Sequence, residues 1–405
     1  MTMIDPRPLD ILDPDFYQDG NAYAKYAWLR NNDPCHWDTV NELWVVTRYD
    51  DIVAIEKNKK VFINSDQDKG GYRPNLPADQ SIIGEDDPLH MARRNLVSRR
   101  FTPRAVMKWQ DHVSAMVTEL LDAALAKDDV EIVNELAAPL PAMMIGLLLG
   151  FPHQMWPKLQ EWSEATIALG GGPRYMNDAG ATAVMEFAGA AAGLYQQKKG
   201  CPADDVMSHW ISVEEQRGGD VGGSPFGLDQ IISDCLLLLD GGAETTRTVI
   251  AWTLLSLADH PDEWDKLQAG ADLDVAVEEF IRWVTPIHNF CRVATEDVEL
   301  HGVTINKGQQ VLMAYPAANR DPEHFEDPET FDVTRTPNNH IAFGFGTHFC
   351  MGASLARLEI KTFFAQLIER VESLHRLRDQ PHVEMPNAFV YGIKESHMRF
   401  ELTST

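Results

Sequence analysis

Apolar residues return at intervals of three to four along most of the chain, which is the spacing of one face of an α-helix. The pattern is clear over 113–126 and over the alanine-rich segment 179–195. Its longest stretch begins near Asp229, just after the glycine-rich segment 218–227, and continues to His260. We predict a flexible loop at 218–227, followed by one helix on the order of 45 Å long. A helix of that length would pass through the centre of the protein.

Shorter segments combine apolar with β-branched residues, which favours β-strands. Such segments lie at 42–49, 298–305 and 309–315. The chain contains no internal repeat and no long low-complexity segment. We therefore predict a single domain over 1–405 that is mainly α-helical with a small β subdomain. We expect its short strands mainly in the N-terminal part, near 295–315 and near 385–402.

Charge and hydropathy narrow the range of functions. The 405 residues include 61 acidic and 35 basic side chains, which gives a net charge of −26. Binding to nucleic acid or to an anionic membrane surface is unfavourable for such a chain. The apolar run 235–239 is too short to cross a bilayer, and the first residues lack the basic and apolar regions of a secretion signal. We expect a cytoplasmic protein without a membrane anchor or a nucleic acid partner.

The cysteines argue against a disulfide framework and a zinc ribbon, because their number is odd and none forms a CxxC pair. They are Cys35, Cys201, Cys235, Cys291 and Cys350. Only Cys350 lies among glycines, in the segment FGFGTHFCMG at 343–352. Glycines there indicate a backbone that turns sharply or lets a bulky group approach. We therefore expect one functional thiol.

The long helix contains an unusual segment, DGGAETT, at 240–246. Two glycines inside a helix cost about 1 kcal/mol each relative to alanine. One interpretation is a kinked core helix with a polar patch that faces solvent. The other is that thin backbone lets a flat ligand lie against the helix, while Glu244 and Thr245 supply a proton path beside it.

The segment EEFIRW places Glu279 and Arg282 three residues apart, on one face of a helix. Exposed pairs of this kind are common and contribute only about 0.3–0.5 kcal/mol. The pair alone therefore indicates little.

Together and in this order, the three segments resemble those of the cytochrome P450 monooxygenases. FGFGTHFCMG resembles their haem-binding loop, DGGAETT their oxygen-activating helix, and EEFIRW their ExxR pair. Segments near 90, 292 and 320 extend the resemblance over essentially the whole chain. The resemblance implies the cytochrome P450 fold, with haem b (iron protoporphyrin IX) between the long central helix and the cysteine-bearing loop.

By this resemblance Cys350 is the thiolate ligand of the haem iron, with its pKa held well below the free value of about 8.5. Such a ligand donates electrons that favour cleavage of an O–O bond on the opposite face of the haem. Gly344, Gly346 and Gly352 let the loop wrap the sulfur and donate N–H groups to it. Phe343 packs against the porphyrin or the sulfur, although an ordinary core position is equally compatible.

The resemblance also assigns the groups around the haem. Cations hold its two propionates: His90, Arg94, Arg292 and His348. On the opposite side Thr245 bonds back to the carbonyl near Gly241 and opens a groove for dioxygen and water. Glu244 relays protons from solvent. The family more often has alanine in place of Gly241.

The resemblance also implies a buried structural network of Glu279, Arg282 and Arg335. Removing one member would leave a buried charge without its partner, which costs about 3–5 kcal/mol. Apolar side chains are expected to line the substrate pocket: Ile82, Ile83, Leu238, Val284, Ile287, Phe290, Phe389 and Val390. They imply hydroxylation of a hydrophobic small molecule such as a terpenoid, a branched fatty acid or a sterol-like lipid. The chain looks most like bacterial members that act on such compounds.

No flavin-binding motif is present, so the resemblance implies electrons from NAD(P)H through a ferredoxin reductase and a ferredoxin. Basic residues that could meet an acidic ferredoxin are Arg99, Arg100, Arg104, Arg357 and Lys361. We expect a monomer. Two alternatives stay open: a non-catalytic haem-thiolate sensor, which would not need Glu244 and Thr245, and a peroxide-driven peroxygenase, which would replace that pair.

Overall fold

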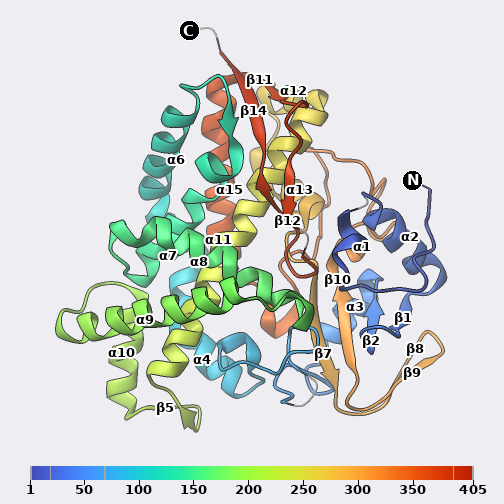
Figure 1. Cartoon of the computed structure of the whole chain (residues 1–405), viewed down its shortest axis with the longest axis vertical. Coiled ribbons are helices and arrows are strands. Elements are labelled where there is room, and N and C mark those ends of the chain that lie inside the picture. The colour runs from blue at the N-terminus through green and yellow to red at the C-terminus, as the bar shows by residue number, and fades with distance from the viewer. Residues whose placement is uncertain (1, 19, 68–69, 386, 404–405) are drawn as a thin grey trace.

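The computed structural model describes residues 2–18, 20–67, 70–385 and 387–403. Helices make up one side of the molecule and a smaller β region with the N-terminal helices makes up the other (Figure 1). The α-helices are α1 (Pro14–Gln18), α2 (Ala22–Asn32), α3 (Tyr49–Lys57), α4 (Leu89–Val97), α5 (Pro103–Val106), α6 (Gln110–Ala124), α7 (Pro139–Leu149), α8 (Trp156–Ile167), α9 (Asp178–Gly200), α10 (Val206–Arg217), α11 (Leu228–Asp259), α12 (Pro261–Gln268), α13 (Leu273–Val284), α14 (Tyr315–Ala318) and α15 (Ala353–Arg370).

The strands form one larger sheet and several small ones. They are β1 (Cys35–Asp38), β2 (Leu43–Val46), β3 (Phe62–Ile63), β4 (Val130–Glu131), β5 (Asp220–Val221), β6 (Ser224–Pro225), β7 (Asn289–Ala294), β8 (Val298–Leu300), β9 (Val303–Ile305), β10 (Gln310–Ala314), β11 (Val371–Arg376), β12 (Val383–Met385), β13 (Gly392–Glu395) and β14 (His397–Leu402). The larger sheet has the order β1-β2-β10-β7-β3, and only the β2–β10 pair in it is parallel among the described strands. Two smaller sheets, with the orders β11-β14-β4 and β12-β13, contain the last four strands of the chain.

The predicted central helix is confirmed to within one residue at each end, because α11 runs from Leu228 to Asp259. The backbone N–H of Gly227 donates to the Gln230 side chain at 3.0 Å, which satisfies one group at the start of the helix. The helix packs against α7, α8, α9, α13 and α15, and most of its apolar side chains are buried. It therefore crosses the interior, as its length predicts (Figure 1).

The strand predictions were partly right. The segments 42–49 and 309–315 contain β2 and β10, whereas 298–305 is a hairpin of two strands, β8 and β9. Strand β7, which lies between β10 and β3, and strand β11 were not predicted as strands. The segment 218–227 is also not only a loop, because β5 and β6 pair within it.

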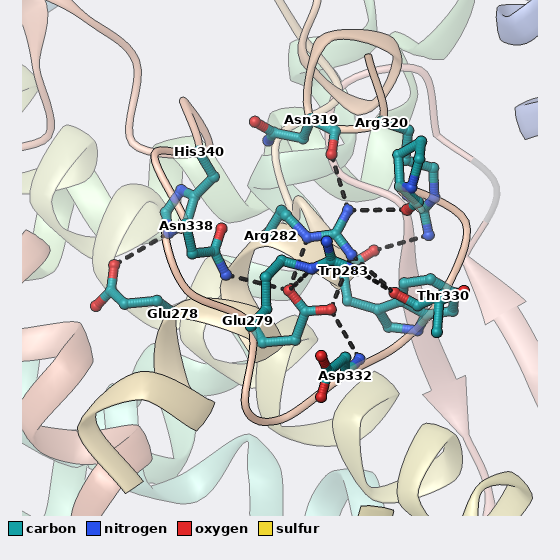
Figure 2. A network of polar contacts seen from close by, with 12 residues as sticks. Glu278, Glu279, Arg282, Trp283, Asn319, Arg320, Thr330, Asp332, Asn338 and His340 are labelled. Carbon is teal, nitrogen blue, oxygen red and sulfur yellow. Dashed lines mark hydrogen bonds and ion pairs between the residues drawn. The ribbon is translucent and has the colours of Figure 1, made fainter. Parts of the chain in front are cut away.

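The buried polar network around α13 fixes the chain next to the cysteine-bearing loop (Figure 2). Arg282 donates from Nε and Nη2 to the two carboxylate oxygens of Glu279 at 2.7 and 2.8 Å, and neither side chain is exposed. Arg335 donates to the same carboxylate at 3.1 Å. Arg282 also donates to the carbonyl of Asn319 at 2.9 Å. The network therefore ties α13 to the long loop that precedes the cysteine.

The neighbouring carboxylate, Glu278, contacts two different residues near the cysteine-bearing loop. It lies 3.1 Å from Nε2 of His340 and accepts a hydrogen bond from Nε of Arg357 at 2.5 Å. His340 precedes the cysteine-bearing loop, and Arg357 is on α15, which follows it. Two consecutive carboxylates of α13 thus hold the chain on both sides of that loop.

We predict that Arg282→Ala lowers the free energy of unfolding by about 3–5 kcal/mol, because Glu279 would stay buried without its main partner. The matched control is Lys361→Ala, which removes one side of the exposed Lys361–Asp274 pair at 2.6 Å. That change is expected to cost less than about 1 kcal/mol. Urea unfolding and the yield of soluble protein measure both effects. Equal stability of the two variants would contradict a structural role for the network.

Candidate active site

A cavity of about 590 Å³ lies between α11 and the cysteine-bearing loop. Gly241, Gly242 and Thr245 of α11 line one side of it. Phe343 and Cys350 line the other side. Most of the remaining lining is apolar. The structure therefore brings the two unusual sequence segments together across one enclosed space.

The cysteine-bearing loop is shaped by its glycines and by short backbone bonds. The N–H of Cys350 donates to the carbonyl of Phe343 at 2.8 Å. Gly344 and Gly346 both have φ of +68°, a conformation that other residues rarely adopt. A Cβ on Gly346 would also lie 2.7 Å from the carbonyl oxygen of Glu56. Gly352 differs, because its φ of −82° is ordinary.

Opposing effects act on the pKa of the Cys350 thiol. Burial raises its pKa, and this effect outweighs the backbone N–H groups of Gly352 and Ala353 and the guanidinium groups of Arg94 and Arg357, which lower it. The predicted N–H donors to the sulfur are therefore present. Without a metal ion the thiol pKa is raised, because removing a thiolate from water costs more than these groups contribute. The low pKa predicted for the haem-bound thiolate stays a prediction.

On α11 the hydroxyl of Thr245 donates to the carbonyl of Gly241, one turn earlier, at 2.8 Å. A Cβ on Gly241 would meet nothing within 4 Å, so thin backbone at this position opens directly into the cavity. A Cβ on Gly242 would lie 2.4 Å from Cδ1 of Ile145 on α7. The two glycines therefore have different roles. Gly241 faces the cavity, and Gly242 allows α11 and α7 to pack closely.

Glu244 does not line the cavity. It is buried and paired with Arg247, whose Nη1 lies 3.0 and 3.1 Å from its two carboxylate oxygens. Nη1 of Arg247 also lies 3.2 Å from Glu164 on α8, a side chain that is 28% exposed. Burial raises the pKa of Glu244. Glu244 therefore reaches the partly exposed Glu164 only through Arg247 among the contacts of the described residues, and its relay of protons from solvent stays a prediction.

Basic residues gather at one end of the cavity. His90, Arg94 and His348 line it, and the rings of His90 and His348 have their centroids 4.0 Å apart. Burial lowers the pKa of His348 far below its ordinary value, and the charges of Arg292, His90, Arg94 and Lys59 lower it further. Arg292 itself is not part of the lining, because it turns toward Glu56 at 3.4 Å.

Comparisons with known proteins place the chain in a family. A family profile described as Cytochrome P450 matches residues 196–400. A steroid C26-monooxygenase of Mycolicibacterium smegmatis is 35% identical, over 97% of this chain and 96% of that protein. A steroid C26-monooxygenase of Mycobacterium tuberculosis is 33% identical, over 98% of each chain.

The chain belongs to the cytochrome P450 family.

Solved structures agree with this assignment. A cytochrome P450 of Mycobacterium marinum in complex with pseudoionone has a TM-score of 0.86 at 30% identity, over 98% of this chain and 99% of that one. A P450 of Bacillus megaterium in complex with testosterone has a TM-score of 0.85 at 30% identity, over 94% and 97% of the chains. The P450 fold predicted from sequence is confirmed, and the protein is a monooxygenase. None of its described helices is long and apolar enough to cross a membrane.

The residues around the cavity of this P450 fit the haem that the family implies. The cavity holds one thiol, and Nε2 of His90 is buried without a hydrogen-bond partner among the described residues. The cations near His348 make one end suited to two carboxylates. The open space beside Gly241 admits a flat group against α11. An iron porphyrin with two propionates satisfies all three features.

Six of the eight apolar side chains predicted for the pocket of the P450 line the cavity. They are Ile82, Ile83, Leu238, Ile287, Phe290 and Phe389. The other two predictions were wrong. Val284 ends α13 and packs into the main core. Val390 pairs with Ile287 in an isolated β-bridge, and neighbouring residues of an extended segment point to opposite sides, so only Phe389 faces the cavity.

The lining also contains polar residues that were not named individually among the side chains predicted for the pocket: Arg73, Asp79, Thr166 and Asp240. Asp240 was quoted as the first residue of the DGGAETT segment but was assigned no role. Its contacts come from distant segments, so no local spacing indicated a role. The charged residue inside an apolar helix was the one available signal.

Gly241→Ala and Gly242→Ala form a matched pair of adjacent substitutions. We predict that Gly241→Ala stabilises the protein by up to about 1 kcal/mol, because alanine favours helix and its methyl group enters open space. Gly242→Ala is expected to destabilise it by about 1–3 kcal/mol, because the methyl group meets Ile145. Urea unfolding midpoints measure both. Shifts of the same sign and size would contradict the different roles assigned to the two glycines.

Proposed function

We propose that this P450 hydroxylates an unactivated C–H bond of a hydrophobic small molecule. One oxygen atom of dioxygen enters that bond, and the other leaves as water with two electrons and two protons. The observation that supports this proposal best is the placement of Cys350 and Thr245 on opposite sides of one largely apolar cavity. A terpenoid, a branched fatty acid or a sterol-like lipid matches the lining. The relatives named as steroid C26-monooxygenases favour the last of these.

Haem b bound through a thiolate supplies the chemistry that activates dioxygen. In this chain Cys350 would be its ligand, and the metal ion would favour the thiolate form that burial alone disfavours. The N–H groups of Gly352 and Ala353 then stabilise the negative sulfur. His90, Arg94, Arg292 and His348 would hold the propionates, although Arg292 is paired with Glu56 at 3.4 Å in this structure.

Thr245 and Glu244 handle protons on the opposite side. Because the Thr245 hydroxyl donates to Gly241, its lone pairs stay available to hold a water molecule in the cavity. Glu244 is the proton source, and it must first exchange its contact with Arg247. Glu164 is the partly exposed acid at the end of this chain of contacts. The pair of acid and alcohol favours the oxygen-dependent monooxygenase over the peroxide-driven alternative.

Electrons come from NAD(P)H through a ferredoxin reductase and a ferredoxin, which docks near the cysteine-bearing loop. Three of the predicted basic residues are already paired within the chain: Arg100 with Asp204, Arg357 with Glu278, and Lys361 with Asp274. Arg99 and Arg104 have no ion pair to another described residue. Phe349 beside the cysteine is 42% exposed, and Met107 is 58% exposed. This part of the surface of a monomer thus combines apolar contact area with positive charge for an acidic partner.

The first prediction from this function concerns the ligand. Reduced protein with carbon monoxide is expected to show the strongly red-shifted Soret band of a thiolate complex, and Cys350→His should abolish that band. The control Cys201→Ser changes an exposed cysteine and should leave the band unchanged. An imidazole-type spectrum of the unmutated protein would rule out Cys350 as the ligand.

The second prediction concerns proton delivery. Thr245→Ala should still bind substrate and accept electrons, while the ratio of hydroxylated product to oxidised nicotinamide falls about tenfold and hydrogen peroxide rises. Thr118→Ala is the matched control, because that hydroxyl makes the same bond to the carbonyl four residues earlier, at 2.9 Å, on α6. Product, cofactor and peroxide are measured together. An unchanged ratio in Thr245→Ala would exclude this role for the hydroxyl.

A further inference from the structure

Glu56 of α3 is a buried carboxylate beside the cysteine-bearing loop, and the function proposed above does not use it. Its side chain is only 1% exposed. A Cβ on Gly344 would lie 3.5 Å from Oε1 of Glu56, and a Cβ on Gly346 would lie 2.7 Å from its carbonyl oxygen. Burial of a carboxylate is costly unless protein groups replace the water that it loses. Glu56 therefore depends on the few polar groups that reach it.

Two side chains reach the Glu56 carboxylate. The hydroxyl of Tyr315 donates to Oε1 at 2.8 Å, and Nη2 of Arg292 lies 3.4 Å from the same oxygen. The other oxygen, Oε2, is buried and has no hydrogen-bond partner among the described residues. Within that part of the chain Arg292 is the only cation that pairs with Glu56. A single guanidinium group thus offsets the charge of this carboxylate.

Arg292 lies on the side of β7 that faces the cavity. It follows Phe290 by two residues in this strand, so the two side chains are on one face. Phe290 lines the cavity, and its ring centroid is 6.1 Å from that of Tyr315. Arg292 and Tyr315 therefore meet Glu56 on the same side of β7 as the cavity, where the propionates of a haem are expected.

Arg94, the other guanidinium group expected to hold a propionate, has different partners. It lines the cavity, and its Nη2 donates to the carbonyl of Phe349 at 2.6 Å. No carboxylate pairs with Arg94 in the residues that the structure describes. Arg94 can therefore give its charge to a propionate, whereas Arg292 is already shared with Glu56.

A propionate at Arg292 would bring a second negative charge to this guanidinium group. Glu56 is held in place, because α3 packs against the short helical turn Gly346–His348 of the cysteine-bearing loop. Burial raises the pKa of Glu56 to about 7, whereas Arg292 and Tyr315 lower it, so the carboxylate carries its charge at higher pH. Like charges repel more strongly in a buried site than in water.

We propose that Glu56 is a positioning residue that competes with a haem propionate for Arg292. Its charge weakens haem binding and lowers the reduction potential of the iron, because a nearby negative charge favours the oxidised, more positive metal ion. If Glu56 only supported the fold, changing it would weaken haem binding instead. This inference rests on the proposed function, since it concerns the haem of the same cavity.

The test compares Glu56→Gln with Glu56→Asp in the haem-loaded protein at pH 8. Glutamine keeps the shape and an acceptor for Tyr315 but removes the charge, whereas aspartate keeps the charge on a shorter side chain. Transfer of haem to excess apomyoglobin, followed by Soret absorbance, should be roughly tenfold slower in Glu56→Gln and no slower in Glu56→Asp. A spectroelectrochemical titration should give a more positive reduction potential in Glu56→Gln only.

Asp51→Asn is the matched control, because it neutralises a carboxylate of the same helix that pairs with His301 at 2.6 Å. It should change neither haem loss nor potential. If Glu56→Gln does not fold, Glu56→Leu, which also removes the charge, decides with the same expected result. Equal or faster haem loss or an unchanged potential in the uncharged variant, or slower loss in Glu56→Asp, overturns the proposal. Failure of the proposed function is recognised separately, by a missing thiolate band of the unmutated protein with carbon monoxide.

Discussion

The position of Cys350 depends on two consecutive buried or half-buried carboxylates of α13. Glu279 binds Arg282 and Arg335 and so fixes the loop before the cysteine, while Glu278 binds His340 and Arg357 on either side of it. Ion pairs of this kind seldom add net stability compared with apolar side chains, but they define one arrangement, because a single missing partner leaves a charge stranded. The thiol can face α11 across a cavity only because the chain around it is fixed in this way.

Burial away from water sets the charge states of the ionisable side chains around that cavity. Burial raises the pKa of Asp240 to about 8, and it also raises the pKa of Cys350. The same burial lowers the pKa of His348. Both kinds of group therefore lose charge in the protein alone. The haem that the family implies would bring a metal ion to the thiol and two carboxylates to the basic residues, and would favour the charged forms at both places. The protein and its cofactor are electrostatically complementary.

Local patterns in the sequence predicted local structure well. The limits of α11 followed from its periodicity, and the Glu279–Arg282 pair followed from a spacing of three on one helix face. Strand β7 was missed because its identity depends on pairing with β10 and β3 from distant segments. Strand β11 was missed because it follows α15 without any intervening turn residue.

In the candidate site, too, sequence reasoning failed where the structure depends on contacts between distant segments. Spacing and resemblance identified Cys350 and Thr245, which lie in short distinctive segments. They could not show that Glu244 is covered, because Glu164 comes from another helix, far earlier in the chain. Val390 was placed in the pocket with Phe389 because the sequence does not give the direction of each side chain in an extended segment.

The two acids of the DGGAETT segment lie one helical turn apart, and both depend on α8. Asp240 bonds Thr166, and Glu244 is reached by Glu164 through Arg247. Since Thr166 and Glu164 are two residues apart on one helix, any displacement of α8 changes both contacts together. Asp240, which lines the cavity, and Glu244, which does not, are therefore both linked to the same element. A glycine at 241 leaves the space between them and Thr245 open to the cavity.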